Sequence, residues 1–404
     1  MPDELPSLSY GRQWIDDDDI RAVTECLRGD WLTQGPAVER FEKALCDATG
    51  ARFAVAVCNG TAALHLAVLA LGVKPGDLGL VPAITFVASA NAIAYAGGKV
   101  RFVDVRPESA LIDLESLERT AETEAKAGRP PRLFIPVDMA GQTADLPAVR
   151  RIADRYGARV LEDAAHSLGA AYRHDGARIR AGSCVHSDAA ILSFHPVKTI
   201  TTGEGGAVLT NSETVAGQLR ELRSHGIHRD PARFQRTDQG PWYHEQENLG
   251  FNYRITDLQC ALGSSQLGKL EKFLARRRDI AALYDAALAR APLQGRLSPL
   301  SPQPGRDHAY HLYVIRVLAA PGQVASARLA LYHHLRARRI FTQVHYIPVC
   351  GQPYYRRHHG ARPEEYPGAT AYYESCLSLP MHPSLSQGDV DRVVQALSEW
   401  VQSS

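Results

Sequence analysis

Residues 188–210 read DAAILSFHPVKTITTGEGGAVLT, a segment in which Lys198 stands between two apolar runs. We expect residues 188–194 and 207–210 to form strands, because short apolar runs bounded by turn residues are typical of buried strands. Lys198 has β-branched neighbours, and the glycines after it let a ligand or a backbone approach closely. A lysine withdrawn from water loses its proton easily and can then attack a carbonyl group. The alternative is a structural hairpin whose lysine reaches out to water.

A carboxylate ends an apolar run further upstream. Residues 158–163 read ARVLED, and Asp163 closes this run before His166. In pyridoxal-phosphate enzymes an ionised carboxylate pairs with the pyridine nitrogen of the cofactor and keeps that nitrogen protonated. Asp163 is our candidate for this role, because a parallel sheet would present it and Lys198 at the same carboxyl edge. Taken by itself, an aspartate in this position more commonly caps the next turn.

The cofactor's phosphate would find donors at residues 58–64, which read CNGTAAL. This segment joins a predicted strand at residues 53–57 to a predicted helix that begins at residue 61 and ends near residue 71. Backbone N–H groups and the helix dipole favour an anion at such a helix start, where Gly60 and Thr61 supply amides and Thr61 a hydroxyl. An ordinary turn with an N-cap would have the same sequence.

The composition is that of an ordinary soluble protein large enough for two packed domains. The chain has 404 residues, of which 45% are hydrophobic, and its formal net charge is +1. Dispersed charges without a basic field argue against nucleic-acid binding. No run approaches the ~20 apolar residues of a membrane span, and residues 1–10 lack the features of a signal peptide. We therefore expect a cytoplasmic protein with no nucleic-acid or membrane partner.

Neither the cysteines nor the histidines form a pattern typical of metal binding. The seven cysteines are scattered and form no C-x-x-C pair, which favours free thiols in a reducing compartment. Sixteen histidines are present, but no H-E-x-x-H spacing occurs. The four acids at residues 16–19 suit the dipole at the start of a helix that ends near residue 27. We expect no metal site.

The order of the predicted elements indicates an α/β fold followed by a smaller α+β unit. Short apolar strands alternate with helical patterns, and beyond those already named they are expected at residues 80–81, 100–103, 133–137 and 160–161. A helix at residues 146–156 has one apolar face that can cover the sheet. Further on we expect a helix at 269–288, strands at 310–317 and 342–346, and a last helix from residue 387. The predicted domains are a large cofactor-binding domain, residues 1–267, and a small C-terminal domain, residues 268–404.

Taken together, these segments resemble the DegT/DnrJ/StrS family of sugar aminotransferases. The resemblance extends over nearly the whole chain, and its anchors are YGRQ at 10–13, WLTQGP at 31–36, GTAAL at 60–64, TFVA at 85–88, EDAAH at 162–166, the Lys198 segment and GFNYR at 250–254. It implies the fold-type I architecture of aspartate aminotransferase, with a mixed, mostly parallel sheet in the large domain. It also implies pyridoxal 5′-phosphate as the cofactor.

Within the family, the chain is most similar to the branch that acts on UDP-4-keto-6-deoxy-N-acetylhexosamines, the C4 aminotransferases of pseudaminic acid biosynthesis. The segments that carry this similarity are 193–206, RSHGI at 223–227, GPWY at 240–243 and HYIP at 345–348. The resemblance implies amination of the C4 keto group with L-glutamate as donor, giving UDP-4-amino-4,6-dideoxy-N-acetyl-β-L-altrosamine. The alternatives are another nucleotide-linked keto sugar, a cyclitol, or a non-catalytic regulator with this fold. Dehydration of a sugar at C3 is disfavoured, because the family's dehydratases have histidine in place of Lys198.

The resemblance also implies roles for individual residues. Lys198 would carry the cofactor, Asp163 would pair with its pyridine nitrogen and His166 would neighbour its ring hydroxyl, and these three are the predicted catalytic residues. The remaining cofactor contacts would come from a stacked aromatic ring and from phosphate ligands, namely Phe86, Gly60, Thr61, Ser193 and Asn252. Of these, Asn252 would reach the phosphate in the partner subunit, which implies a homodimer with shared active sites.

Substrate contacts follow from the same resemblance. The segments that match the family's nucleotide-sugar groove contain Tyr10, Asp30, Trp31, Leu32, Thr33, His345 and Tyr346. Many relatives have glutamine where this chain has His166, a titratable group whose charge depends on its surroundings. The alternative role of His166 is that of a buried histidine bound to a backbone carbonyl.

Overall fold

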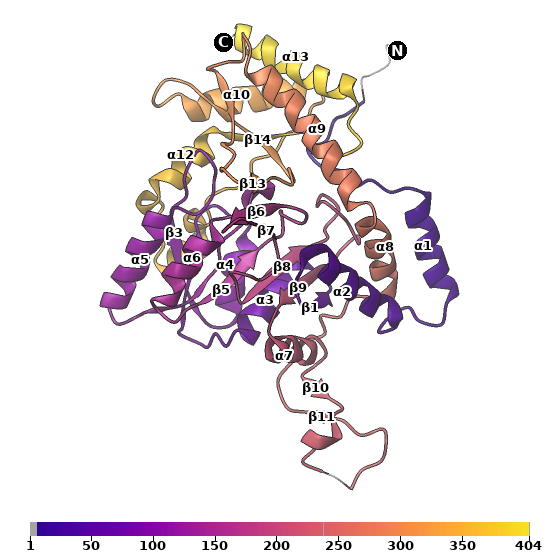
Figure 1. Ribbon diagram of the computed structural model, residues 1–404. Coiled ribbons are helices and arrows are strands. Elements are labelled where there is room, and N and C mark those ends of the chain that lie inside the picture. Colours follow the sequence, from indigo (N-terminus) through magenta and orange to yellow (C-terminus); the bar gives the residue numbers. More distant parts are fainter. Residues whose placement is uncertain (1–5, 237, 404) are drawn as a thin grey trace.

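A seven-stranded mixed sheet forms the centre of the computed structural model, which describes residues 6–236 and 238–403 (Figure 1). In the order β1-β9-β8-β5-β4-β2-β3, its strands are β1 (Phe53–Val57), β9 (Gly206–Thr210), β8 (Ala189–Ser193), β5 (Arg159–Asp163), β4 (Pro131–Phe134), β2 (Leu78–Pro82) and β3 (Lys99–Val103). Strand β9 pairs antiparallel with β1 and β8, and the other neighbouring pairs are parallel. The sheet is therefore mostly parallel, as predicted.

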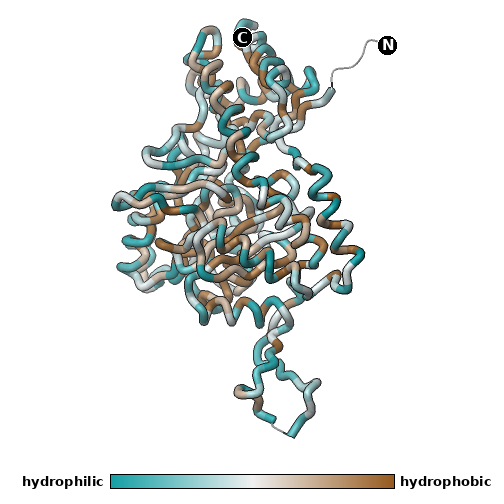
Figure 2. The backbone as a smooth tube through the Cα atoms, turned by 45° about the vertical axis from the view of Figure 1, so that its right-hand side comes forward, coloured by the Kyte–Doolittle hydropathy of each residue, from teal (hydrophilic) through white to brown (hydrophobic). Residues whose placement is uncertain are grey.

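Helices cover both faces of this sheet. They are α2 (Pro36–Thr49), α3 (Gly60–Ala70), α4 (Val87–Tyr95), α5 (Leu114–Lys126), α6 (Leu146–Asp154), α7 (Glu213–Arg223) and α8 (Asp257–Leu267). Helix α1 (Asp17–Arg28) lies outside this layer and packs against α8. Because successive side chains of a strand point to opposite faces, Val55 and Val57 of β1 share a core with α3 and α4, whereas Ala54 and Ala56 share a core with α2 and α8. Figure 2 shows the hydrophobic segments, in brown, gathered at the centre of the molecule.

The chain after α8 builds a further hydrophobic core around an antiparallel sheet of order β12-β14-β15. Its elements are α9 (Leu270–Leu288), β12 (Leu297–Pro299), β14 (Tyr313–Val317), α10 (Val324–Ala337), β15 (Cys376–Leu379) and α13 (Gln387–Ser403). The remaining helices, α11 (Pro353–His359) and α12 (Pro367–Ser375), pack instead into the core that contains α3 and α4, through Tyr355, Ala369 and Tyr372. Leu8 also packs into this core, and its backbone bonds to Arg339 and Phe341. We propose that residues 1–267 and 268–404 are two domains, with Leu8 tying the first to the second.

Smaller elements connect these parts. A three-stranded sheet contains β13 (Arg306–Asp307), β6 (Ala171–His174) and β7 (Ala177–Arg180), and the short 3-10 helices are η1 (Met139–Gly141), η2 (Pro231–Arg233), η3 (Val349–Gly351) and η4 (Pro363–Glu365). Strands β10 (Ile227–His228) and β11 (Glu245–Gln246) form the base of an arm that projects from the body next to α7 (Figure 1). None of the described helices is long and apolar enough to cross a membrane.

Three predicted strands are shorter than expected. The strand predicted at residues 188–194 is observed as Ala189–Ser193. The strand predicted at residues 133–137 is observed as Pro131–Phe134, because Pro136 has no N–H to donate and interrupts the ladder, although Ile135 N still donates to Leu80 O and Val137 bridges to Asp163. The strand predicted at residues 310–317 begins at Tyr313. Tyr310 has a left-handed φ of 48°, and Ala309 and Leu312 donate hydrogen bonds to the backbone of η1 instead of to a strand.

The strand predicted at residues 342–346 is wrong. These residues are all described, and within them Gln343 alone forms a bridge, to Ser378 of β15. The side chains of His345 and Tyr346 are engaged by other groups, since His345 Nδ1 lies 2.8 Å from Ser378 Oγ and the Tyr346 hydroxyl contacts His166. Residues 345 and 346 are therefore held by side-chain contacts with Ser378 and His166, and not by the backbone pairing of a sheet.

Candidate active site

The carboxyl ends of β1, β5 and β8 open into a cavity of about 680 Å³. This is the edge of an open parallel sheet at which ligands are generally bound, and the volume is in the range of small-molecule sites. Most of the predicted site residues line it, namely Tyr10, Gly60, Thr61, Phe86, Asp163, His166, Ser193, Lys198, His345 and Tyr346. The structure thus brings together groups that are far apart in the sequence.

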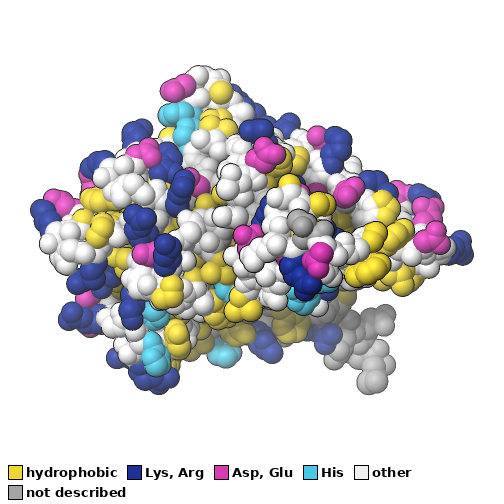
Figure 3. All heavy atoms as spheres, turned by 90° about the horizontal axis from the view of Figure 1, so that it is seen from below, with side chains coloured by type: hydrophobic (Ala, Val, Ile, Leu, Met, Phe, Trp, Pro, Cys, Tyr) yellow, Lys and Arg dark blue, Asp and Glu magenta, His cyan; other side chains and the backbone are white. Residues whose placement is uncertain are grey.

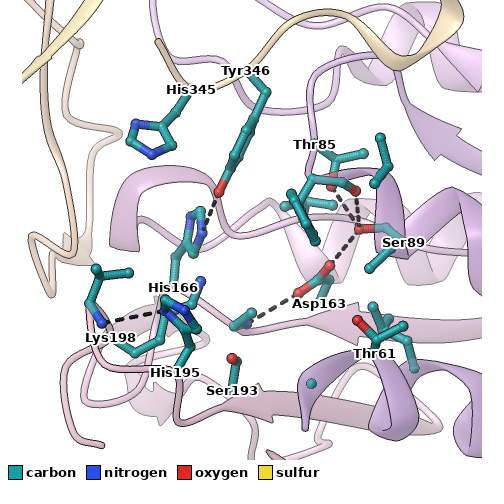
Figure 4. Close-up of a pocket in the computed structure, with 18 of the residues that line it drawn as sticks. Thr61, Thr85, Ser89, Asp163, His166, Ser193, His195, Lys198, His345 and Tyr346 are labelled. Carbon is teal, nitrogen blue, oxygen red and sulfur yellow. Dashed lines mark hydrogen bonds between the residues drawn. The ribbon is translucent and has the colours of Figure 1, made fainter. Parts of the chain in front are cut away.

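Lys198 lies in the connection between β8 and β9 with its side chain at the cavity (Figure 4). Its backbone N–H donates to His195 O at 2.8 Å, which holds the connection in a turn. Burial lowers the pKa of Lys198 to about 8, and the nearby Asp163 carboxylate offsets only part of this effect. Among the described residues its amine has no hydrogen-bond or ion-pair partner. Lys198 is therefore a partly deprotonated amine that is free to react.

Asp163 ends β5 and is buried at the floor of the cavity. One carboxylate oxygen accepts from Ser89 Oγ at 2.7 Å, and the other accepts from Ala165 N at 3.2 Å. The Ser89 hydroxyl lies 2.7 Å from Thr85 Oγ1, so the serine is itself held in place. Burial raises the pKa of Asp163, while these hydrogen bonds and Lys198 lower it in part. A positively charged ligand group at this position would relieve the cost of burying the carboxylate.

The start of α3 forms a cradle for an anion. The Asn59 side chain accepts from Ala62 N at 2.8 Å, which leaves the amides of Gly60 and Thr61 without an acceptor in the described part of the chain. A Cβ on Gly60 would lie 3.0 Å from Ser193 Cβ and 3.2 Å from Ser193 Oγ. The serine hydroxyl of β8 therefore faces the helix start, in a space that only glycine leaves open.

Replacing Thr61 by valine is expected to weaken binding of pyridoxal 5′-phosphate about 10- to 100-fold, because one hydrogen bond to a charged group contributes about 1.5–3 kcal/mol. Valine keeps the shape of threonine and removes only the hydroxyl. The dissociation constant can be measured by titrating the apoprotein and following the absorbance of the bound cofactor. Thr61→Ser is the matched control and should bind nearly as well as the wild type. Equal affinities for the valine and serine variants would remove Thr61 Oγ1 from the phosphate site.

His166 and the aromatic residues form the side of the cavity opposite the cradle (Figure 4). The Tyr346 hydroxyl lies 3.1 Å from His166 Nε2, and the rings of Phe86 and Tyr346 are 6.0 Å apart. Burial, followed by the charge of Lys198, lowers the pKa of His166 well below its ordinary value. His166 is therefore neutral, and its ring is bonded to a tyrosine hydroxyl, not to a backbone carbonyl.

Five predicted residues lie outside this cavity. Asp30, Trp31, Leu32 and Thr33 are in the loop between α1 and α2, where Thr33 bridges to Thr256 at the start of α8. Asn252 follows α7 and pairs with Ser224. None of the five residues lines the cavity of its own chain. The segment of Asn252 nevertheless lies close to the cradle, because Cys58 N donates to Tyr253 O and Val57 bridges to Arg254.

The cavity also contains polar residues that the sequence alone did not single out. They are Asn59, Thr85, Ser89, His195, Glu204, His311, Gln343 and Gln352. Ser89 could have been proposed from the sequence, because it lies four residues after Thr85 and directly follows residues 85–88, a segment already recognised by its resemblance. His311 had none, since it comes from the second half of the chain and no local pattern marks it.

A pair of buried acids, Asp138 and Glu162, lies next to Asp163. The carboxyl groups of Asp138 and Glu162 are fully buried and in contact with each other. Asp138 accepts from Ala144 N at 2.8 Å and Ser167 Oγ at 2.6 Å, and no cation among the described residues forms an ion pair with either acid. Burial raises the pKa of Asp138 to about 6, and burial together with Asp138 raises the pKa of Glu162. The pair therefore retains one proton between two oxygens.

Replacing Glu162 by glutamine should change how stability depends on pH. A carboxyl group whose pKa is raised on folding stabilises the native state below its unfolded pKa, and this contribution is lost as pH rises through the folded pKa, which is about 6 for Asp138 and well above the ordinary value for Glu162. The variant keeps a donor for Asp138 and has no shared proton to lose. Relative to the wild type, its free energy of unfolding should therefore rise by roughly 1–3 kcal/mol between pH 4 and pH 7.

Urea unfolding at several pH values measures this difference. Glu115→Gln, at an exposed position on α5, is the control and should run parallel to the wild type at every pH. Parallel curves for Glu162→Gln as well would show that the two buried acids do not share a proton.

The residues of this cavity fit pyridoxal 5′-phosphate. The phosphate would meet the unpaired amides of α3 with Thr61 and Ser193, the pyridine nitrogen would meet Asp163, and the aldehyde carbon would meet the free amine of Lys198. A buried carboxylate without a cationic partner and an amine without any partner are each explained by the same ligand. The observed groups therefore match the phosphate, the pyridine nitrogen and the aldehyde of the cofactor.

The chain is similar to known proteins over nearly its whole length. The model of the DegT/DnrJ/EryC1/StrS aminotransferase family matches residues 13–398. The chain is 37% identical over 400 residues to the spore coat polysaccharide biosynthesis protein SpsC of Bacillus subtilis, covering 98% of both chains. Among solved structures it is similar to Helicobacter pylori PseC, an aminotransferase involved in the biosynthesis of pseudaminic acid, with a TM-score of 0.87, 26% identity, and coverage of 99% of this chain and 100% of that one. Spr1654 of Streptococcus pneumoniae, a proposed sugar aminotransferase solved in its PLP form, matches with a TM-score of 0.86 and 26% identity over 98% of this chain and 99% of that one.

Proposed function

This chain belongs to the DegT/DnrJ/EryC1/StrS aminotransferase family and is a pyridoxal-phosphate-dependent sugar aminotransferase, and we propose that it aminates the C4 keto group of a UDP-4-keto-6-deoxy-N-acetylhexosamine. L-glutamate would be the amino donor and UDP-4-amino-4,6-dideoxy-N-acetyl-β-L-altrosamine the product. The observation that carries this proposal is the similarity to PseC over the whole chain, together with the HYIP segment whose His345 and Tyr346 line the cavity. The similarity to a spore coat polysaccharide protein favours another nucleotide-linked keto sugar as the second candidate.

The residues of the cavity suit the proton transfers of such a reaction. Pyridoxal phosphate, when bound, supplies an electron sink for the bond electrons that a substrate carbon releases with its proton. Lys198 would move that proton between the substrate carbon and C4′ of the cofactor, on either side of the transferred nitrogen, because its amine is held at the cavity and has a pKa of about 8. Asp163 would hold the positive charge on the pyridine nitrogen, and Thr61 and Ser193 would hold the phosphate. Tyr346 and His166 would exclude water from one side of the reacting atoms.

A single half-reaction tests the proposed substrate. The protein is loaded with the amino form of the cofactor, UDP-4-keto-6-deoxy-N-acetyl-altrosamine is added, and the visible absorbance of the cofactor bound to Lys198 is followed. A rapid return of that absorbance is expected. UDP-N-acetylglucosamine, which has no keto group, is the control. If the absorbance does not return although glutamate still forms the amino form, the sugar assignment is wrong, and dTDP-linked 4-keto sugars are the next substrates to test.

We also propose a cytoplasmic homodimer with shared active sites. Asn252 and residues 30–33 do not line the cavity of their own chain, and we expect them to contact cofactor or sugar in the partner subunit. Large hydrophobic side chains are exposed along and after α1, namely Ile15, Ile20, Leu27, Trp31 and Leu32, and Figure 3 shows hydrophobic side chains between charged ones on the face from which the arm projects. Exposed patches of this kind are typical of interfaces. Light scattering should give twice the chain mass, and an active monomer would contradict the proposal.

A further inference from the structure

Two histidine rings are in contact beside the cavity. The ring centroids of His166 and His311 lie 4.3 Å apart with an interplanar angle of 47°. Both side chains are buried, with 6% and 4% of their surface exposed. In each ring the Nδ1 atom is buried and has no hydrogen-bond partner in the described part of the chain. His166 has a second contact through Nε2, which lies 3.1 Å from the Tyr346 hydroxyl.

A single hydrogen bond would satisfy both unpaired atoms. Buried polar atoms in native proteins almost always have a partner, because leaving one unpaired is costly. A neutral imidazole has one N–H donor and one bare acceptor nitrogen. Burial, with nearby positive charge, lowers the pKa of both His166 and His311 well below the ordinary value, so both rings are neutral. Two neutral rings whose centroids lie 4.3 Å apart are close enough for one N–H···N bond, and such a bond has no net charge to bury.

The buried cation Arg277 favours one of the two rings as the donor in this hydrogen bond. Arg277 of α9 has 1% of its surface exposed and donates to three backbone carbonyls, those of Tyr310, His311 and Met381, at 3.0–3.2 Å. No carboxylate among the described residues forms an ion pair with it. Lys198 and His345 act on both rings, whereas Arg277 acts on His311 and not on His166, so Arg277 is the charge that distinguishes the two rings. A positive charge orients neutral dipoles with their N–H ends pointing away from it.

We propose that His311 is a positioning residue that donates from Nδ1 to Nδ1 of His166, and so fixes His166 as a neutral donor at Nε2, on the side of Tyr346 and the cofactor. In this arrangement the Nδ1–H of His311 and the Nε2–H of His166 both point away from Arg277. The carbonyls bound by Arg277 hold the backbone of residues 310–311 in place, where Tyr310 has a left-handed φ of 48°. A donor at Nε2 suits the ring oxygen of pyridoxal phosphate. The proposal rests on the placement of His166 beside that oxygen.

Two variants of equal size separate the hydrogen bond from packing. In His311→Asn the amide nitrogen can occupy the place of Nδ1 and donate to His166, whereas His311→Leu has the same shape and no donor. Long-range nitrogen NMR of protein labelled with 15N-histidine reports which nitrogen of His166 carries its proton, with the signals assigned by His166→Gln. The spectra are recorded on the apoprotein and on the protein with bound cofactor, without any sugar.

In the wild type and in His311→Asn we expect the His166 proton on Nε2, and in His311→Leu a mixture of both tautomers. The rate of the half-reaction with glutamate should fall at least about tenfold in His311→Leu and stay within about threefold in His311→Asn. A proton on Nδ1 of His166 in the wild type would overturn the proposal, and so would equal rates for the two variants. None of these readouts uses the sugar, so a wrong sugar assignment would leave the result intact.

Discussion

Lys198→Ala is expected to lose amino transfer by about 10⁴-fold or more while keeping the fold. The variant lacks both the amine that carries the cofactor and the base that moves the proton at the reacting carbon, and each function contributes a large factor. The fold should persist, because Lys198 has no hydrogen-bond or ion-pair partner through its amine among the described residues. Burying an amine is unfavourable, as its lowered pKa of about 8 indicates. Steady-state rates and circular dichroism measure the two effects.

Lys198→Arg is the matched control for this prediction. Arginine keeps a long cationic side chain but stays protonated and cannot attack a carbonyl. It should therefore be as inactive as the alanine variant. Adding a small primary amine to Lys198→Ala should restore part of the rate, because the missing base is then supplied from solution. Near-normal turnover in either variant without added amine would show that another group is the base.

The central sheet could be predicted from the sequence because its physical signals are local. Each of its strands is a short apolar run, and the alternation of Val55 and Val57 with Ala54 and Ala56 already indicates two covered faces. The roles of Lys198, Asp163 and Thr61 could be predicted for the same reason. Each residue lies at or shortly after the end of a buried strand, and the ends of parallel strands meet at one edge of the sheet.

Tertiary contacts account for what the sequence did not predict. Residues 310–312 have the pattern of a strand, yet Ala309 and Leu312 bond to η1, so the strand begins only at Tyr313. The acid pair of Asp138 and Glu162 and the ring pair of His166 and His311 each join segments that no spacing rule connects. Such contacts exist only once the chain is folded, and the unpaired Nδ1 atoms and the raised pKa values of the two buried acids arise only then.

Asp163→Asn is expected to reduce the rate roughly 10²- to 10³-fold with the cofactor still bound. Asparagine has the same shape and can keep the contacts with Ser89 and Ala165 N, but an amide cannot hold a positive charge on the pyridine nitrogen. Losing one partner of a buried ion pair costs about 3–5 kcal/mol, and each 1.4 kcal/mol in the barrier is about tenfold in rate. The half-reaction with glutamate measures the rate, and absorbance of the bound cofactor measures its retention.

Ser89→Ala separates the charge of Asp163 from its position. It removes the 2.7 Å hydrogen bond to the carboxylate and keeps the negative charge, so we expect a rate lowered about 10- to 100-fold, since one hydrogen bond to a charged group contributes about 1.5–3 kcal/mol. A loss in Asp163→Asn no larger than in Ser89→Ala would mean that geometry and not charge is what Asp163 provides. Undiminished activity of Asp163→Asn would remove it from the cofactor site. A large loss in Asp163→Asn beside a smaller one in Ser89→Ala is the pattern expected if the carboxylate keeps the pyridine nitrogen protonated, because only the first variant removes the charge that does so.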